Sequence, residues 1–227
     1  MIKKMSHIGM RHEAAGGENQ DAFCYGKNGR YQVISLADGV SSCKEAKTGA
    51  EIASRAITEL FLKKGNHFLG FENGQIAELA LSHVLFELKR QAVEEKERLE
   101  AYSSTVASVL YDQKSGKLLY YSLGDSLILA VEKGRCRILA MPSDSSRGCC
   151  VTTTKNVSKM IGAKVVDASN LESVVICSDG AWRQMFAINR LKPEAAALLV
   201  NHQFGRLKEY LMQQECFDDY SVISMEL

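Results

Sequence analysis

The sequence lacks several features that would assign a chain to a class at once. It has only 2 prolines in 227 residues, and no stretch approaches the roughly 20 apolar residues of a membrane-spanning helix. Its 28 Lys and Arg nearly balance its 27 Asp and Glu, so the formal net charge is +1. These properties argue against a disordered chain, a membrane protein and a chain drawn to nucleic acid by its overall charge. We expect one folded domain over residues 1–227.

Cysteine spacing also excludes two common small-domain designs. The 7 cysteines are odd in number, and none is spaced as a Cys-x-x-Cys pair, so neither a disulfide framework nor a zinc site is indicated. The N-terminus has two lysines but no apolar run suited to a signal peptide. We therefore expect reduced thiols and a cytoplasmic protein. No long exposed apolar helix face is evident, so a monomer is the simplest expectation.

Apolar periodicity predicts alternating strands and helices in the first half of the chain. An apolar run is expected to form a strand that stops at Asp38-Gly39, and a break rich in glycine and asparagine should separate two helices. Three later β-like runs suggest an antiparallel meander, with Leu123-Gly124-Asp125 as a hairpin connection. The expected ranges are a strand at 31–37, a helix at about 45–61, the break at 65–74, a helix at about 75–100, and strands at 104–111, 117–122 and 126–131.

The last third of the chain is expected to add two more strands around a helical region. A strand should run directly into Asp179-Gly180, and Asp218-Asp219 should open the terminal strand. Pro193 lies where a helix is expected to begin. The expected ranges are strands at 173–178 and 220–227 and helical segments at 181–190, 193–200 and 204–214.

Acidic residues recur where the expected strands end. Asp38, Asp125, Asp179 and Asp218 all have this position, and each by itself is well explained as ordinary turn chemistry. If the strands bring them to a common end, carboxylates about 4 Å apart would repel by about 4 kcal/mol per pair at an effective dielectric constant of 20. Raised pKa values or bound cations would relieve that repulsion, and a site of carboxylates suits Mg²⁺ or Mn²⁺.

Five short motifs occur in a characteristic order. They are Asn19-Gln20-Asp21-Ala22-Phe23, Ala37-Asp38-Gly39, Gly124-Asp125-Ser126, Cys177-Ser178-Asp179-Gly180-Ala181-Trp182 and Asp218-Asp219-Tyr220-Ser221-Val222-Ile223. In this order they resemble the motifs of the metal-dependent Ser/Thr protein phosphatases (PPM, type 2C), especially the compact bacterial members. A further fragment, Ser103-Ser104-Thr105, resembles the small-hydroxyl strand start of that family.

The resemblance implies a fold and a binuclear metal centre. The implied fold is of the α+β class, a four-layer α-β-β-α sandwich in which two antiparallel sheets pack face to face and are flanked by helices. The implied cofactors are two Mn²⁺ or Mg²⁺ ions, with a third left open. By matching position, the implied ligands are Asp38 as the bridge, the carbonyl of Gly39, Asp179 and Asp218, with Asp125 for the third ion and Asp21 in or just behind the metal shell.

The resemblance also implies an activity and its partners. A hydroxide held between two cations would attack the phosphorus of a phosphoserine or phosphothreonine, and an arginine would offset charge on the phosphoryl oxygens. The expected partners are a phosphorylated protein substrate and a cognate Ser/Thr kinase in bacterial signalling, with no nucleic acid and no membrane.

Several positions depart from the family pattern. Gln20 and Val40 stand where many relatives have Glu and His, and Arg11 lies farther from the first motif than the usual phosphate-binding arginine. Arg11 is the candidate phosphate contact, with an ordinary surface arginine as the alternative. His12 is a candidate phosphate contact or proton donor, with a solvated loop histidine as the alternative. These departures keep a second hypothesis open, a pseudophosphatase that acts as a binding or sensing module.

Overall fold

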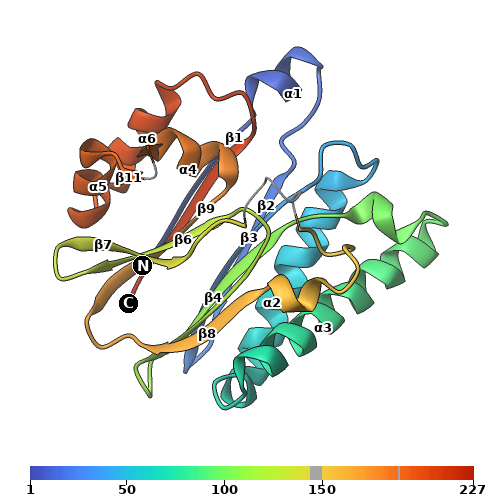
Figure 1. Ribbon diagram of the computed structural model, residues 1–227, viewed down its shortest axis with the longest axis horizontal. Coiled ribbons are helices and arrows are strands. Elements are labelled where there is room, and N and C mark those ends of the chain that lie inside the picture. The colour runs from blue at the N-terminus through green and yellow to red at the C-terminus, as the bar shows by residue number, and fades with distance from the viewer. Residues whose placement is uncertain (144–149, 189) are drawn as a thin grey trace.

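Two five-stranded antiparallel sheets pack face to face, with helices on both outer faces (Figure 1). The computed structural model describes residues 1–143, 150–188 and 190–227. Helices α2 and α3 cover one sheet, and α4, α5 and α6 cover the other (Figure 1). The predicted four-layer α-β-β-α sandwich of the α+β class is therefore confirmed.

The first sheet contains the strands nearest both ends of the chain. Its strand order is β1-β12-β9-β6-β7, and every neighbouring pair is antiparallel. The bounds are β1 (Ile2–His7), β12 (Tyr220–Glu226), β9 (Leu171–Cys177), β6 (Leu127–Glu132) and β7 (Arg135–Ala140).

The second sheet takes its strands from residues between 21 and 167. Its strand order is β2-β3-β4-β5-β8, again antiparallel throughout. The bounds are β2 (Asp21–Lys27), β3 (Tyr31–Asp38), β4 (Val106–Asp112), β5 (Lys117–Leu123) and β8 (Gly162–Asp167). A small hairpin, β10 (Phe186–Ala187) with β11 (Arg190–Leu191), lies outside both sheets.

The helices supply the outer layers. Their bounds are α1 (Met10–Ala14), α2 (Ala46–Phe68), α3 (Asn73–Glu94), α4 (Asp179–Met185), α5 (Pro193–Val200) and α6 (Phe204–Met212), with 3₁₀ turns η1 (Leu99–Tyr102) and η3 (Val157–Met160). Within the described residues, no helix is both long and apolar enough to cross a membrane.

Three apolar layers hold the sandwich together. One lies between α2, α3 and the second sheet, and includes Ile57, Phe61 and Leu88. The middle layer joins the two sheets, and the third packs α4 to α6 on the first sheet. The central strands are therefore covered on both faces, which explains why their sequences are nearly continuous apolar runs rather than alternating patterns.

Two sequence expectations about connections were wrong. The break expected at 65–74 is shorter, because α2 continues through Gly65 to Phe68. A Cβ at Gly65 would lie 2.8 Å from the Leu110 side chain, so this glycine allows close helix-to-sheet packing instead of ending the helix. The segment Leu123-Gly124-Asp125 is not a hairpin, since β5 and β6 belong to different sheets. Gly124 has φ +106° at this crossing, a conformation that glycine adopts without strain.

Candidate metal centre

Asp21 and Asp38 lie opposite each other at one end of the second sheet. They are register partners at the end of the β2–β3 pairing. Asp21 is 3% exposed, and neither of its carboxylate oxygens makes a hydrogen bond of normal geometry with the described residues, although the Ser178 and Ser221 hydroxyl groups lie near enough to lower its pKa. A buried carboxylate without donors is costly, so this position needs an explanation beyond turn formation.

The loop after Asp38 is held against the start of β4. The backbone N–H of Asp38 donates to Thr105 Oγ1 at 3.1 Å, and the N–H of Thr105 donates to the Asp38 carbonyl at 2.8 Å. Gly39 packs so closely on the Ala46 backbone that a Cβ would overlap its carbonyl oxygen. These bonds hold the Asp38-Gly39 turn beside residues 103–105, where Gly39 also forms an isolated antiparallel bridge with Ser104.

Asp179 starts helix α4 immediately after β9. Its Oδ1 is buried and unpartnered among the described residues, whereas Oδ2 lies 2.7 Å from Arg183 Nη1. The adjacent Trp182 donates its Nε1–H to the Asp125 carbonyl at 2.7 Å. Trp182 therefore ties the segment that crosses between the sheets to helix α4, and with it places Asp125 near Asp179.

Asp218 and Asp219 occupy the turn that enters β12. The backbone N–H of Asp219 donates to Asp218 Oδ1 at 3.0 Å. Gly9 packs against the Asp218 backbone so closely that it leaves no room for a Cβ. Asp218 is partly exposed while Asp219 is 2% exposed, so the two neighbouring acids have different surroundings.

The electrostatic surroundings of Asp38 show that the acids converge. Burial raises the pKa of Asp38 well above its ordinary value, and the charges of Asp21, Asp179, Asp125 and Asp218 raise it further. The charges of the other four are felt at Asp38, so the five aspartates predicted as ligands lie in one region of the fold although they come from five separate motifs. Their mutual repulsion is the effect expected of a carboxylate cluster.

Two more pKa shifts have the same origin. Burial raises the pKa of Asp21 to about 7, partly offset by the hydroxyl groups of Ser221 and Ser178. Burial also raises the pKa of Asp179 to about 6, and the nearby charge of Asp125 adds to this effect while Arg183 opposes it. At neutral pH these acids hold negative charge at a cost in free energy, which a bound cation would remove.

The acids do not form a closed ligand cage. Among the described residues, no group of three or more acidic, histidine or cysteine side chains is placed to hold a metal ion by itself. Mg²⁺ in proteins commonly takes one or two carboxylates and keeps several waters. The arrangement therefore suits ions that are only partly coordinated by protein, with buried carboxylate oxygens of Asp21 and Asp179 still available.

Arg11 and His12 lie on the short helix α1 and have different environments. The backbone N–H of Arg11 donates to the Phe217 carbonyl at 3.1 Å, which brings Arg11 beside Asp218, and its side chain is exposed. His12 is 8% exposed, and its Nδ1 lies 2.8 Å from Asp219 Oδ2. His12 Nε2 is buried without a partner among the described residues. His12 is therefore not the solvated loop histidine that was weighed as its alternative.

Sequence reasoning did not assign a role to Asp219, Ser178 or Ser221. Ser178 Oγ accepts from the Ser221 N–H at 2.9 Å, which links the turn of Asp179 to β12. These residues lie inside the motifs, next to the predicted ligands, so the signal was present. Burial and hydrogen bonds to residues far away in the sequence distinguish Asp219 from Asp218, and both are tertiary properties.

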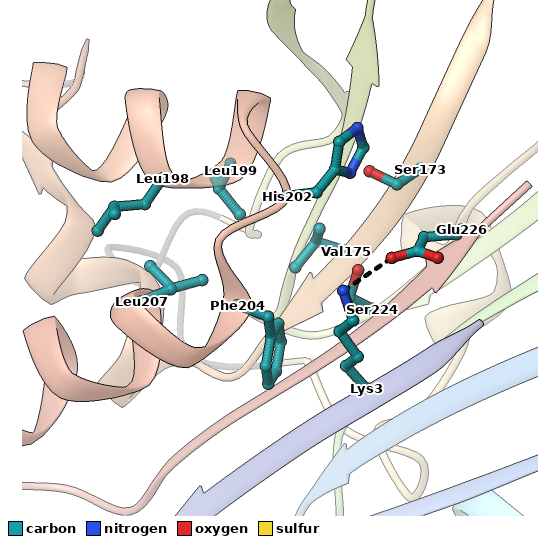
Figure 2. Close-up of a pocket in the computed structure, with 10 residues that line it drawn as sticks. All are labelled: Lys3, Ser173, Val175, Leu198, Leu199, His202, Phe204, Leu207, Ser224 and Glu226. Carbon is teal, nitrogen blue, oxygen red and sulfur yellow. Dashed lines mark hydrogen bonds and ion pairs between the residues drawn. The ribbon is translucent and has the colours of Figure 1, made fainter.

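One cavity lies beside the aspartates, and a second lies at the other end of the first sheet. A cleft of about 480 Å³ opens beside Asp21 and includes Asn19, Phe23, Lys47 and Glu51. A second cavity, of about 20 Å³, lies between α5, α6 and the first sheet. Figure 2 shows the residues that line it, including the ion pair of Lys3 with Glu226. This cavity lies at the opposite ends of β9 and β12 from Asp179 and Asp218, and its volume suits about one water molecule.

Comparison with known proteins agrees with this geometry. The family profile for protein phosphatase 2C matches residues 8–215, a range that includes Asp21, Asp38, Asp125 and Asp179 but ends before Asp218. No curated protein matches the chain in sequence.

Solved structures of bacterial phosphatases share the fold. The serine/threonine phosphatase Stp1 from Staphylococcus aureus is 16% identical, with a TM-score of 0.70, and the match covers 100% of this chain and 94% of that one. The serine/threonine phosphatase of S. agalactiae is 17% identical, with a TM-score of 0.71 and coverage of 99% and 98%. The Mycobacterium tuberculosis phosphatase PstP/Ppp is 14% identical, with a TM-score of 0.66 and coverage of 100% and 98%. Because the family profile spans most of its length, the chain belongs to the protein phosphatase 2C family.

Proposed function

We propose that this protein phosphatase 2C family member hydrolyses phosphoserine and phosphothreonine in proteins with the help of Mn²⁺ or Mg²⁺. The observation that carries the proposal is the convergence of three aspartates with raised pKa values, Asp21, Asp38 and Asp179. Asp21 and Asp179 are also buried, and both oxygens of Asp21 and one of Asp179 lack a hydrogen-bond partner among the described residues. A group of acids in this state is costly unless cations neutralise it.

The residues fit a pair of hard divalent ions. Asp38 is the proposed bridging ligand, and the Gly39 carbonyl, Asp179 and Asp218 complete the protein ligands. Asp125 is the candidate for a third ion, and Asp21 supports the ligands from behind. All donors are oxygens, the type that Mg²⁺ and Mn²⁺ prefer.

When bound, the ions would supply an activated water and would offset negative charge on the phosphoryl group. The protein residues contribute position and charge. Asp38 is centred among the other acids, as the four charges acting on its pKa indicate. Arg11 is the proposed contact to the phosphoryl oxygens, because its side chain is exposed and its backbone is bonded next to Asp218.

The wider assignments follow from the proposed activity. The substrate is a phosphorylated protein, and a cognate Ser/Thr kinase is the expected partner. The cleft beside Asp21 is a candidate surface for the residues that flank the phosphoryl group. We further propose a cytoplasmic monomer that binds neither nucleic acid nor membrane and acts in bacterial signalling.

The direct test measures hydrolysis of p-nitrophenyl phosphate and of a phosphothreonine peptide by metal-free protein before and after addition of Mn²⁺ or Mg²⁺. We expect activity only with a divalent ion, and its loss when EDTA is added. Asp167→Ala is the matched control, because it removes an exposed acid on β8 and should change neither activity nor metal binding. Full activity in EDTA would contradict the proposal.

The pseudophosphatase alternative makes a different prediction in the same protein. A binding module that has lost its centre should bind no Mn²⁺ by calorimetry and show no rise in melting temperature when Mn²⁺ is added. No observation on the described residues favours this alternative, since every proposed ligand position has an oxygen atom that can bind a metal ion.

A further inference from the structure

Asp219 accepts three hydrogen bonds with a side chain that is 2% exposed. Its Oδ1 receives the backbone N–H of Gly9 at 2.8 Å. Its Oδ2 receives the backbone N–H of Gln20 at 2.6 Å and faces Nδ1 of His12 at 2.8 Å. Because a carboxylate only accepts, Nδ1 of His12 carries the proton in this contact.

The three donors belong to one segment of the chain. Gly9 precedes helix α1, His12 lies within it, and Gln20 follows it, so one carboxylate fastens both ends of residues 9–20. Two backbone bonds reinforce the near end, from Met10 N to Cys216 O at 3.0 Å and from Arg11 N to Phe217 O at 3.1 Å. Helix α1 has 5 residues and no side-chain cap, so it depends on these contacts for its position.

Asp219 also touches the other side of the proposed centre. Its backbone N–H donates to Asp218 Oδ1 at 3.0 Å. The same residue therefore orients a proposed metal ligand through its backbone and holds the segment with Arg11 through its side chain. A carboxylate is needed for the second role, because the donors lie on both oxygens. An amide in either orientation would point its NH₂ group at a donor.

We propose that Asp219 is a positioning residue that fixes residues 9–20. It thereby holds the Arg11 guanidinium at the end of the sandwich where the proposed metal ligands lie, here called the acidic end, so that Arg11 can contact the phosphoryl group of the substrate. This inference rests on the proposed function. His12 takes part in the same arrangement, because its side chain on α1 donates a hydrogen bond to Asp219. In this assignment His12 works through its Nδ1 and is not required as a proton donor.

The first test uses Asp219→Asn, which keeps the shape and removes one acceptor. We expect KM for p-nitrophenyl phosphate and the inhibition constant of inorganic phosphate to rise about tenfold, in the range for loss of a hydrogen bond to a charged group. We expect kcat to fall less than about threefold and the calorimetric Mn²⁺ affinity to change less than about threefold, because no proposed ligand side chain is removed.

A double-mutant cycle with Arg11→Ala separates positioning from simple anchoring. If Asp219 acts through Arg11, Asp219→Asn should add little to the KM of the Arg11→Ala variant, because the two changes remove one function. Additive effects, or a fall in kcat and melting temperature with KM unchanged, would overturn the assignment.

A second pair of variants tests the same arrangement even if Asp219→Asn fails to fold. His12→Asn places an amide N–H where Nδ1 lies and retains the bond to Asp219, whereas His12→Ala removes it. We expect KM near the wild-type value for His12→Asn and a rise of about threefold for His12→Ala, less than for the loss of an Asp219 acceptor. An equal loss of kcat in both variants would instead assign His12 as the proton donor and overturn the positioning role.

Hydrogen exchange tests the arrangement without any turnover. In metal-free protein, the amides of Gly9 and Gln20 should exchange slowly and lose protection in Asp219→Asn. Unchanged protection would overturn the inference. If the wild-type protein has no phosphatase activity, the proposed function fails, while loss of this protection would still show that Asp219 holds residues 9–20.

Discussion

The second sheet has a buried aspartate at each end, and the two differ in their hydrogen-bond partners and in the direction of their pKa shifts. Asp112 is fully buried and accepts Arg30 Nε at 2.9 Å and Nη2 at 2.7 Å, as well as Ser115 Oγ at 2.7 Å. These bonds hold the pKa of Asp112 well below its usual range. Asp21, at the other end, has no partner on either oxygen among the described residues, and burial raises its pKa to about 7.

The contrast separates a structural acid from a functional one. Asp112 has its own cation and a full set of donors, so it stabilises the turn after β4. Asp21, Asp38 and Asp179 lie together, and in the described part of the chain Arg183 is the one cation that forms an ion pair with any of their carboxylates. Lys47 Nζ also lies 2.7 Å from Asp21, but it donates to the backbone carbonyl and not to the carboxylate. An acid group in this state is arranged for a cation that the protein does not itself supply.

The largest effect should come from Asp38→Asn, which removes the central charge of the acidic end. We expect Mn²⁺-dependent hydrolysis to fall at least about 100-fold, as when a principal electrostatic group of an active site is lost. The melting temperature of the metal-free protein should rise, because mutual repulsion is relieved. Phosphatase assays and thermal scans in EDTA measure both. A fall in melting temperature would mean that Asp38 is a structural acid like Asp112.

Asp112→Ala should give the reverse pattern. It leaves Arg30 and the Lys114 N–H without their acceptor, so the free energy of unfolding should fall by about 3 kcal/mol. For a chain of this size the melting temperature should drop by about 5 to 10 °C. The kcat of the folded protein should stay within about twofold of wild type. Denaturant titration measures the stability, and steady-state kinetics measure kcat. A large loss of kcat would contradict the assignment of Asp112 as a purely structural acid.

The pH dependence of stability compares the two ends a third time, and its change per pH unit should be smaller than the loss of stability expected for Asp112→Ala. In metal-free protein the pKa values of Asp21 and Asp179 are raised to about 7 and about 6 from an unfolded value of 3.8. The folded state therefore binds more protons between about pH 4 and pH 7, and its stability should fall as pH rises, by about 1 to 3 kcal/mol per pH unit because up to two carboxyl groups ionise over this interval. The stability due to Asp112, whose pKa is depressed, should be lost only below about pH 4.

Thermal unfolding in EDTA from pH 4 to pH 8 tests this dependence, and a parallel series with saturating Mn²⁺ is the control. Bound cations favour the ionised acids, so Mn²⁺ should remove the decline between pH 5 and pH 7. A metal-free protein that gains stability over that interval would contradict the repulsion inferred at the acidic end.

Much of the site could be predicted because its parts are local. Asp38 and Asp179 each follow an apolar run and precede a glycine, a pattern readable in a few residues. The predicted helix at 193–200 coincides with α5, where Pro193 marks the start. The prediction for Leu123-Gly124-Asp125 was wrong, because a hairpin and a crossing between sheets use the same turn residues. The sheet to which β6 belongs depends on β9, which is distant in sequence.

The sequence by itself determined the fold class, the family resemblance and the aspartates that mark the acidic end, because strand and turn patterns are set by neighbouring residues. Only the tertiary structure decided which acids are paired and which are not. The sequence does not show that Asp112 has a cationic partner while Asp21 has none, and Asp219 looks like a second copy of Asp218. Burial and hydrogen bonding distinguish the members of each pair, and the partners of Asp219 lie about 200 residues away in the chain. A carboxyl group takes its charge state and its role from what surrounds it in space, and that information does not lie in its immediate neighbours.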